Sequence, residues 1–463
     1  MWKATVVGAG LAGCECAWQL AERGVRVTLI EQKRLRSSPA HHSLNLAELV
    51  CSNSLRGESP TVAVGTLKQE LLLCHSLLLR IAHETRVAAG GALAVDRERF
   101  SSSVTRHIQS HPNIELVHAC CDAIPPHRPC VIATGPLTSD LLAQDIAQTI
   151  GTHHLAYYDA IAPIVDADSI DWTQVFRQSR YGKGENPEQR VAPQATYHDA
   201  NRQRAANEPS SAQNDQAYVN CPMDQQQYLA FVETLLTQDK LRARDFEDAS
   251  YFEGCLPVEE LASRGTMTLA FGPMKPVGLQ DPTTGKRPFA VVQLRAENEH
   301  ETAYNLVGFQ TRLTQQGQGK VFRMIPGLAG ARFLRWGSMH RNTFVDAPRV
   351  LDDHLGVRGT EGLYLAGQIT GVEGYVESMA CGLLCGWIVA ARLRGTRFSL
   401  PPRTTTLGGL MSHLTRPVTP FQPSNVNWAL VEPIERAKSR AQKKQALADR
   451  ALADLRAWLA ELE

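Results

Sequence analysis

Residues 4–13 read Ala4-Thr5-Val6-Val7-Gly8-Ala9-Gly10-Leu11-Ala12-Gly13, and the fold of the chain can be inferred from this segment outward. The apolar residues before Gly8 predict a strand, and the residues that follow predict a helix that stops at Gly24. Each glycine falls where a bound dinucleotide needs one. Gly8 allows a tight turn, Gly10 lets a pyrophosphate approach the backbone, and Gly13 lets the helix pack against the strand. The stretch therefore predicts the start of a dinucleotide-binding βαβ unit.

A second strand is predicted over residues 25–30, and it ends at Glu31. An acidic residue at this place accepts hydrogen bonds from the ribose hydroxyls of a dinucleotide. The helix N-terminus would offer free N–H groups and a partial positive charge to the phosphates. An ordinary βαβ turn is the alternative interpretation. It is disfavoured because strand, glycines, helix, second strand and terminal acid all occur in register.

Composition limits the class of protein. The 463 residues are too many for one hydrophobic core, so two or three domains are expected. A net charge of +1 means that a nucleic acid would have to bind local basic patches. The 11 cysteines lack paired or zinc-type spacing, which predicts reduced thiols, no metal site and a cytoplasmic protein. The longest apolar run, residues 379–393, is interrupted by glycines and is too short to span a membrane.

Residues 1–155 are expected to form the first part of a doubly wound domain. The leucines of residues 66–84 predict one continuous helix. Residues 130–133 predict a strand that runs into Thr134 and Gly135. Gly135 is therefore a second strand-end glycine that would lie against a bound dinucleotide.

From residue 156 the pattern changes to that of a mixed α+β domain, expected over residues 156–317. Turns rather than helices separate its predicted strands, which are residues 266–271, 289–294 and 304–309. Residues 185–216 have almost no aliphatic side chains, which predicts a disordered insertion.

The chain then returns to the first domain, whose second part is expected over residues 318–430. A strand that ends at Gly367-Gln368 precedes Gly371-Val372 and an apolar helix predicted over residues 376–393. In split flavin-binding folds such a helix closes over the cofactor with its N-terminus toward the flavin. The alternative is a buried helix whose glycines allow close packing. Residues 431–463 predict a terminal helix that packs on the domain, with RNA contact as the weaker alternative.

The predicted fold class is therefore α/β, with a split Rossmann-like FAD-binding domain of the glutathione reductase type and an inserted α+β domain. The sequence also resembles the TrmFO family (formerly Gid), the folate- and FAD-dependent tRNA uracil-5 methyltransferases. The matching stretches follow one another in order and cover most of the chain between residues 4 and 390. They are residues 8–13, 39–42, 47–56, 90–97, 133–137, 218–223, 252–257, 271–279, 285–288, 291–295, 304–311, 339–344 and 366–378.

The resemblance implies an enzyme that forms 5-methyluridine in the T-loop of tRNA. Its carbon would come from 5,10-methylenetetrahydrofolate and its hydride from reduced FAD, which NADPH or NADH would regenerate. tRNA, folate and a nicotinamide would be its partners, with no stable protein partner. The residues expected at the FAD are Gly8, Ala9, Gly10, Leu11, Ala12, Gly13, Glu31, Gly135, Gly367, Gln368, Gly371 and Val372.

Two cysteines match positions that the family uses in its chemistry, Cys51 and Cys221. Uracil C5 becomes a nucleophile when a thiolate adds at C6, and a base then removes the C5 proton. By hypothesis one of the two thiolates adds to C6, and the other acts as the base or protects the flavin intermediate. We favour Cys221 as the nucleophile and Cys51 as the base on the flavin side. The alternative, a buried core residue in each case, is disfavoured because polar neighbours surround both. Cys255 is a third candidate that we interpret as structural.

Other polar residues have weaker assignments. His340, Arg341 and Asn342 are candidates for folate binding, and an interior hydrogen-bonded histidine is an equal alternative. Five cations near turns are candidates for contacts with RNA phosphates, although solvated surface charge is the usual explanation. They are Lys275, Lys286, Arg287, Arg295 and Arg312.

Three rival functions remain open at this point. The same chemistry could act on a ribosomal RNA uridine. A GidA-type modification of a wobble uridine is a second rival, and a non-catalytic FAD-binding protein associated with RNA is a third. The retained pair of cysteines disfavours the last two. The sequence departs from the family pattern in the length of the 185–216 insertion, in Gln32-Lys33-Arg34 and in residues 43–46.

Overall fold

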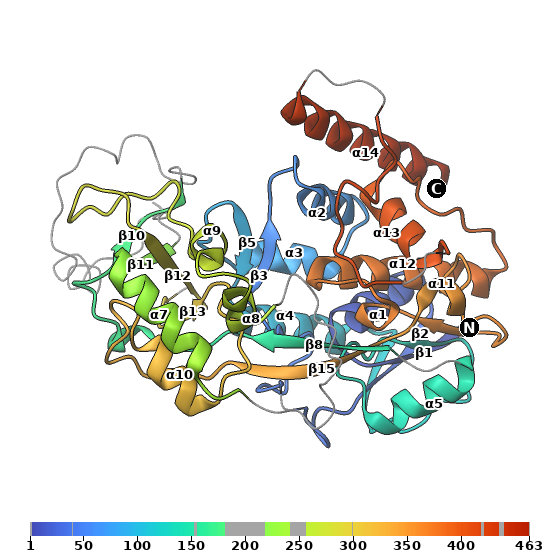
Figure 1. The fold of residues 1–463 in the computed structure, drawn as a ribbon. Coiled ribbons are helices and arrows are strands. Elements are labelled where there is room, and N and C mark those ends of the chain that lie inside the picture. The colour runs from blue at the N-terminus through green and yellow to red at the C-terminus, as the bar shows by residue number, and fades with distance from the viewer. Residues whose placement is uncertain are drawn as a thin grey trace, which may run out of the picture. The chain divides into compact units, whose positions relative to one another are not determined.

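The computed structural model describes residues 2–38, 40–151, 155–180, 218–240, 256–298, 300–417, 421–434 and 439–462. The insertion predicted over residues 185–216 lies outside these ranges, as does Cys255. The chain folds into two compact units (Figure 1). Unit 1 contains Met1–Thr85, Val95–Tyr158 and His340–Glu463, and unit 2 contains Arg86–Ala94 and Asp159–Met339.

Unit 1 is built on a five-stranded parallel sheet in the order β16-β7-β1-β2-β6. Its strands are β1 (Lys3–Val7), β2 (Arg26–Glu31), β6 (Ile114–His118), β7 (Cys130–Ile132) and β16 (Leu363–Leu365). In register, Val6 of β1 lies between Leu29 of β2 and Val131 of β7, and all three are fully buried. Because β16 comes from the far end of the chain and pairs with β7, the domain is split. The predicted α/β class with a Rossmann-like core is confirmed.

Helices cover this sheet, and two of them are packed through glycines. They are α1 (Leu11–Glu22) and α12 (Tyr375–Arg394). A Cβ on Gly382 of α12 would lie 2.2 Å from the carbonyl oxygen of Ala12, so this position requires glycine. By length and composition α12 is the one membrane-span candidate among the described residues, but 83% of its apolar window is buried inside the protein. The glycines of α12 therefore allow close packing, as the alternative interpretation of this helix stated.

The remaining elements of unit 1 surround this core. They are β3 (Ser54–Gly57), α2 (Ala63–Leu73), α3 (Leu77–Glu84), α4 (Arg97–Ser110), α5 (Asp140–Ile150), α11 (Ala347–Val350), the 3-10 turn η5 (Gln368–Thr370), α13 (Thr406–Thr415) and α14 (Arg440–Leu462). β8 (Leu155–Ile161) and β15 (Ser338–Phe344) pair with each other and carry the chain out of the unit and back.

The single helix predicted over residues 66–84 is two helices, α2 and α3. The chain turns at His75, whose φ is +57°. The buried carboxylate of Glu15 accepts hydrogen bonds from the N–H groups of Leu77 and Leu78 at 3.3 and 3.0 Å. A carboxylate at this place caps the new helix N-terminus, so a tertiary contact overrides the leucine periodicity.

A second buried carboxylate, Glu70 of α2, caps α13 in the same way. It accepts hydrogen bonds from the N–H groups of Thr406 and Leu407, both at 2.8 Å. Burial raises the pKa of Glu70 from 4.5 to about 7, although these hydrogen bonds oppose the shift. The folded state therefore binds the Glu70 proton more tightly than the unfolded chain does.

We expect this group to make the free energy of unfolding fall as the pH rises from about 4.5 through about 7. One unit of pKa corresponds to about 1.4 kcal/mol, so the loss is of the order of 3 kcal/mol. Denaturant unfolding of the wild type and Glu70→Gln at pH 5 to 8 checks this. The wild type should lose stability relative to the variant as pH rises. Two parallel stability curves would contradict the expectation.

Unit 2 is an α+β unit with a six-stranded sheet in the order β10-β11-β12-β13-β9-β14. Its pairs are antiparallel, and the strands are β9 (Ile164–Asp166), β10 (Phe176–Arg177), β11 (Tyr218–Met223), β12 (Ala290–Ala296), β13 (Ala303–Leu306) and β14 (Phe333–Arg335). Its other elements are β4 (Arg86–Val87), β5 (Ala92–Val95), the 3-10 turn η1 (Ala167–Ser169), α7 (Gln225–Thr237), α8 (Val258–Ser263), α9 (Thr268–Phe271) and α10 (Gln315–Phe322). The helices and one face of the sheet share a core that includes Tyr228, Phe231 and Phe322.

Two expectations for this part of the chain differ from the structure. The strand predicted over residues 266–271 is the short helix α9, because the Tyr228 hydroxyl donates to the carbonyl of Thr266 and accepts from the N–H of Ala270. The expected domain boundary at residue 318 also differs from the structure, in which unit 2 extends to Met339. Residues 318–339 lie in unit 2, where β14 pairs with β9.

Candidate functional site

The turn after β1 forms a tightly packed cradle. Gly8 has a φ of +95°, and a Cβ on it would lie 2.7 Å from the carbonyl oxygen of Ala133. A Cβ on Gly13 would lie 1.8 Å from the carbonyl oxygen of Gly8. Both positions therefore require glycine for reasons internal to the fold. The ends of β1 and β7 meet here, as the sequence pattern predicted.

Gly10 differs from Gly8 and Gly13 because the space around it is open. A Cβ on Gly10 would meet no atom within 4 Å, and the same is true of Gly135 after β7. Gly10 is also the N-cap of α1, where no side chain caps the helix and no acidic residue lies in the first turn. An uncapped helix N-terminus beside open space suits a phosphate group. The residues present therefore fit a dinucleotide.

Glu31 closes the cradle from the end of β2. One carboxylate oxygen accepts the N–H of Ala9 and the other accepts the N–H of Lys33, both at 2.8 Å. The buried ammonium group of Lys33 donates to the carbonyl of Asn45 and lies 3.2 Å from the carboxylate of Glu48. Lys33 thus ties the loop after β2 to residues 45–48, a function that sequence reasoning missed.

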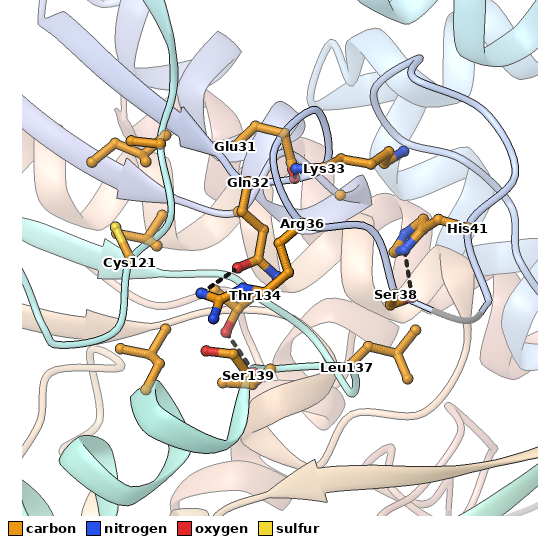
Figure 2. A pocket seen from close by; sticks show the side chains of 17 residues that line it. Glu31, Gln32, Lys33, Arg36, Ser38, His41, Cys121, Thr134, Leu137 and Ser139 are labelled. Atoms are coloured by element: carbon orange, nitrogen blue, oxygen red, sulfur yellow. Dashed lines mark hydrogen bonds between the residues drawn. The ribbon is translucent and has the colours of Figure 1, made fainter.

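A cleft opens at this turn, and Figure 2 shows the side chains that line it. It holds about 640 Å³ of empty space, part of which is open solvent. On one side Ser38 Oγ lies 2.7 Å from Nδ1 of His41, and burial lowers the pKa of His41. Other lining residues are Val7, Gly8, Gly10, Ile30, Glu31, Gln32, Lys33, Arg36, Ala119, Cys121, Thr134, Leu137, Thr138, Ser139 and Leu142.

The third strand end, after β16, also reaches α1. Gly367 has a φ of +80°, and a Cβ there would lie 2.5 Å from Cβ of Ala12. Gly371, with a φ of +93°, lies against the ring of Phe421. Val372 is fully buried. The structure therefore brings the N-terminal glycines, Gly135 and Gly367 around one end of the parallel sheet.

Cys51 is half-buried in a loop that is tied to the N-terminus of α12. The hydroxyl oxygen of Tyr375, the first residue of α12, accepts the N–H groups of Cys51 and Ser52 at 2.8 and 3.1 Å. The guanidinium group of Arg97 donates to the carbonyls of Leu49 and Cys51, the latter at 3.5 Å. Burial, with a smaller contribution from Cys51, raises the pKa of Tyr375, so its hydroxyl stays protonated. The thiol is thus held beside the helix that follows the predicted cofactor contacts.

Two buried carboxyl groups flank Tyr375. Glu377 accepts the N–H of Val426 at 2.8 Å and pairs with the guanidinium group of Arg56. Glu373 accepts the side-chain amide of Gln368 at 2.9 Å. Burial, followed by the charge of Glu377, raises the pKa of Glu373 well above its usual range. The site therefore favours a protonated carboxyl next to Val372, which sequence reasoning also missed.

Cys221 lies in unit 2, in the middle of β11, and the structure corrects our interpretation of its surroundings. Strand alternation places Val219, Cys221 and Met223 on the core face, and the thiol is fully buried. Burial raises the pKa of Cys221, which disfavours the thiolate. Its polar neighbour Asn220 faces the other side of the sheet and bonds to Gln293. The polar neighbour Asn220 therefore does not indicate that the thiol of Cys221 is accessible, because adjacent residues of a strand face opposite sides of the sheet.

This difference in burial predicts different thiol reactivity in the free protein. Iodoacetamide followed by peptide mass spectrometry should label Cys51 at least ~100-fold faster than Cys221, because only an accessible thiolate reacts. Exposed Cys120 serves as the positive control. Equal labelling rates for Cys51 and Cys221 would contradict the placement of Cys221 in the core.

The remaining sequence candidates divide into three groups. The backbone of His340, Arg341 and Asn342 lies in β15, and their side chains lie outside what the structure describes. Arg295 is buried, and Arg312 forms an ion pair with Glu260. The last group, Lys275, Lys286 and Arg287, is exposed.

The parallel sheet, its three glycine-bearing strand ends and the uncapped α1 define an α/β flavoprotein fold with an FAD-type dinucleotide cradle. The family model described as "Glucose inhibited division protein A" matches residues 3–200 and 188–397. GidA of Aquifex aeolicus has the same fold, with a TM-score of 0.67 at 15% identity over 99% of this chain and 73% of that one.

Closer relatives are found among proteins named methylenetetrahydrofolate–tRNA-(uracil-5-)-methyltransferase TrmFO. The protein from Syntrophotalea carbinolica is 52% identical over 98% of this chain and 93% of its own. The protein from Geobacter sulfurreducens is 53% identical over 98% of both chains. The chain therefore belongs to the GidA family and, within it, to the TrmFO family.

Proposed function

We propose that this protein methylates C5 of a uridine in tRNA with a carbon from methylenetetrahydrofolate. The observation that carries the proposal is full-length similarity, at about half identity, to relatives named for this reaction. The cradle residues Gly8, Gly10, Gly13 and Glu31 and the thiol of Cys51 add physical support. The T-loop as the position in tRNA, and a cytoplasmic location, are finer parts of the same proposal.

FAD fits the cradle of unit 1, where the N-terminus of α1 would hold its phosphates and Glu31 its ribose. When bound and reduced, FAD supplies the hydride that completes the methyl group. We propose NADPH or NADH as the reductant. Gly367, Gln368, Gly371 and Val372 would lie along the cofactor ahead of α12, whose dipole favours negative charge at its N-terminus.

Cys51 is the thiol that we propose to act on the flavin side of the reaction. Tyr375 and Arg97 bond to its backbone, which positions the segment that carries the thiol. The role that the sequence suggested, removal of the C5 proton, needs a group that gains and releases a proton at a defined place. Glu373 is a second buried group that can hold a proton in the same region.

Cys221 remains a proposed nucleophile under one added requirement. Its thiol is inside the core of unit 2, so attack on uracil C6 needs the core face of β11 to become accessible during the cycle. Faster labelling of Cys221 when tRNA is added would support this role. Folate binding by His340, Arg341 and Asn342 also stays a proposal.

The proposal is tested by incubating the purified protein with unmodified tRNA transcript, methylenetetrahydrofolate with a labelled methylene, FAD and NADPH. Nucleoside analysis should show labelled 5-methyluridine in tRNA. Label in ribosomal RNA but not in tRNA would identify ribosomal RNA, rather than tRNA, as the substrate. A modified wobble uridine without 5-methyluridine would instead favour GidA-type chemistry, and no label in any RNA would contradict methylation.

A further inference from the structure

Unit 2 carries a segment, residues 271–287, that exposes an aromatic side chain and three cations, and we call it the 271–287 surface. Its members are Phe271, Lys275, Val277, Lys286 and Arg287. Phe271, at the end of α9, is 79% exposed, and Val277 is 40% exposed. An exposed phenyl ring and an exposed valine that share a short segment with three exposed cations form a candidate contact surface.

The backbone that carries Phe271 and Lys275 is braced against the sheet. Met274 is fully buried, and its carbonyl accepts the N–H of Val291 in β12 at 2.9 Å. The guanidinium group of Arg180 donates to the carbonyl of Lys275 and, at 3.1 Å, to that of Val277. The exposure of Phe271 is therefore not a result of a loose loop.

A second turn places the other two cations. The N–H of Asp281 donates to the carbonyl of Lys286 at 2.9 Å, and Gly285 adopts a φ of +66°. The Asp281 carboxylate accepts hydrogen bonds from Thr283 and Thr284 within the turn, at 2.9 and 3.0 Å. This turn is fixed internally, and it leaves the side chains of Lys286 and Arg287 exposed.

In the described part of the chain, Lys275, Lys286 and Arg287 form no ion pair, whereas Arg312 pairs with Glu260 and Arg332 pairs with Asp166. Unpaired cations and an exposed ring on one segment match the chemistry of an RNA loop. Phosphates take the cations, and an unstacked base takes the aromatic face.

We propose that the 271–287 surface binds the tRNA substrate, with Phe271 stacked on an unpaired base and Lys275, Lys286 and Arg287 in contact with phosphates. The inference rests on the proposed function and deepens it, because it names the surface of unit 2 that meets the RNA. Of the five cations suggested by the sequence, this proposal assigns three to RNA binding. Arg295 is excluded because it is buried, and Arg312 because it pairs with Glu260.

Binding of a fluorescent unmodified tRNA transcript to the full-length protein, measured over a range of salt concentrations, tests this surface. Phe271→Ala should weaken binding by about 5- to 100-fold with little change in salt dependence, and Phe271→Trp should restore binding. Changing Lys275, Lys286 and Arg287 together to alanine should weaken binding and lower the salt slope by about 2. Exposed Lys320 and Leu334, changed singly to alanine, are the matched controls in unit 2.

The possible outcomes distinguish failure of the proposed RNA-binding surface from failure of the proposed function. If the wild type methylates tRNA while every variant keeps wild-type affinity and salt slope, the surface is wrong and the function stands. If Lys320→Ala and Leu334→Ala weaken binding as much as the test variants, the assigned surface is also wrong. If the wild type neither binds nor methylates tRNA, both proposals are wrong.

Discussion

Gly10→Val is expected to yield a folded protein that no longer retains FAD. The Cβ of the new side chain would enter the open space beside the N-terminus of α1, where the structure has no atom within 4 Å. The φ of Gly10 is −75°, which valine adopts without strain, so the fold should survive. Affinity for FAD should fall at least ~100-fold, because the side chain blocks the approach of the pyrophosphate. Flavin absorbance after purification and titration of the apoprotein with FAD measure the effect.

Two further glycines give this experiment its controls. Gly330→Val places the same side chain in open space in unit 2 and should leave FAD binding unchanged. Gly13→Ala should instead damage the fold of unit 1, because its Cβ would lie 1.8 Å from the carbonyl oxygen of Gly8. A yellow Gly10→Val protein with wild-type FAD affinity would contradict the location of the phosphate site.

Cys51→Ala is expected to abolish methyl transfer while the protein keeps its flavin and its melting temperature. Loss of a positioned group that transfers a proton or acts as a nucleophile typically lowers turnover by ~10²- to 10⁴-fold. Cys51 is only half-buried, so alanine leaves no large cavity. Single-turnover methylation of tRNA by the reduced protein measures the loss directly.

Tyr375→Phe and Cys120→Ala complete this test. Tyr375→Phe removes the oxygen that accepts the N–H groups of Cys51 and Ser52. It should lower turnover less than Cys51→Ala does, because the thiol group is retained and only its positioning is weakened. Cys120→Ala changes an exposed thiol that is not among the residues lining the cleft, and it should not lower turnover. Wild-type turnover in Cys51→Ala would exclude Cys51 from the chemistry.

The parts of the site that could be predicted from sequence are local. Gly8, Gly10, Gly13 and Glu31 lie within one βαβ unit, so their spacing alone specifies the turn, the open space and the closing acid. The later strand ends at Gly135 and Gly367 could be recognised because a parallel sheet collects the carboxyl ends of its strands at one edge.

The parts that sequence reasoning missed depend on contacts between distant residues. Tyr375 holds the backbone of Cys51 across 324 positions, and no local pattern encodes that contact. Glu15 divides a leucine-rich stretch into two helices for the same reason. The surroundings of Cys221 were misjudged because polar residues that alternate with it point to the opposite face of β11.

The origin of the atoms in the new methyl group distinguishes folate-dependent methylation from every rival function. The reduced holoprotein is incubated with unmodified tRNA and methylenetetrahydrofolate that carries a heavy carbon and two deuterons in its methylene, in ordinary water. We expect 5-methyluridine that contains the heavy carbon and both deuterons, with the third hydrogen from the reduced flavin. An unlabelled methyl group, or unmodified uridine with flavin present and reduced, would contradict it.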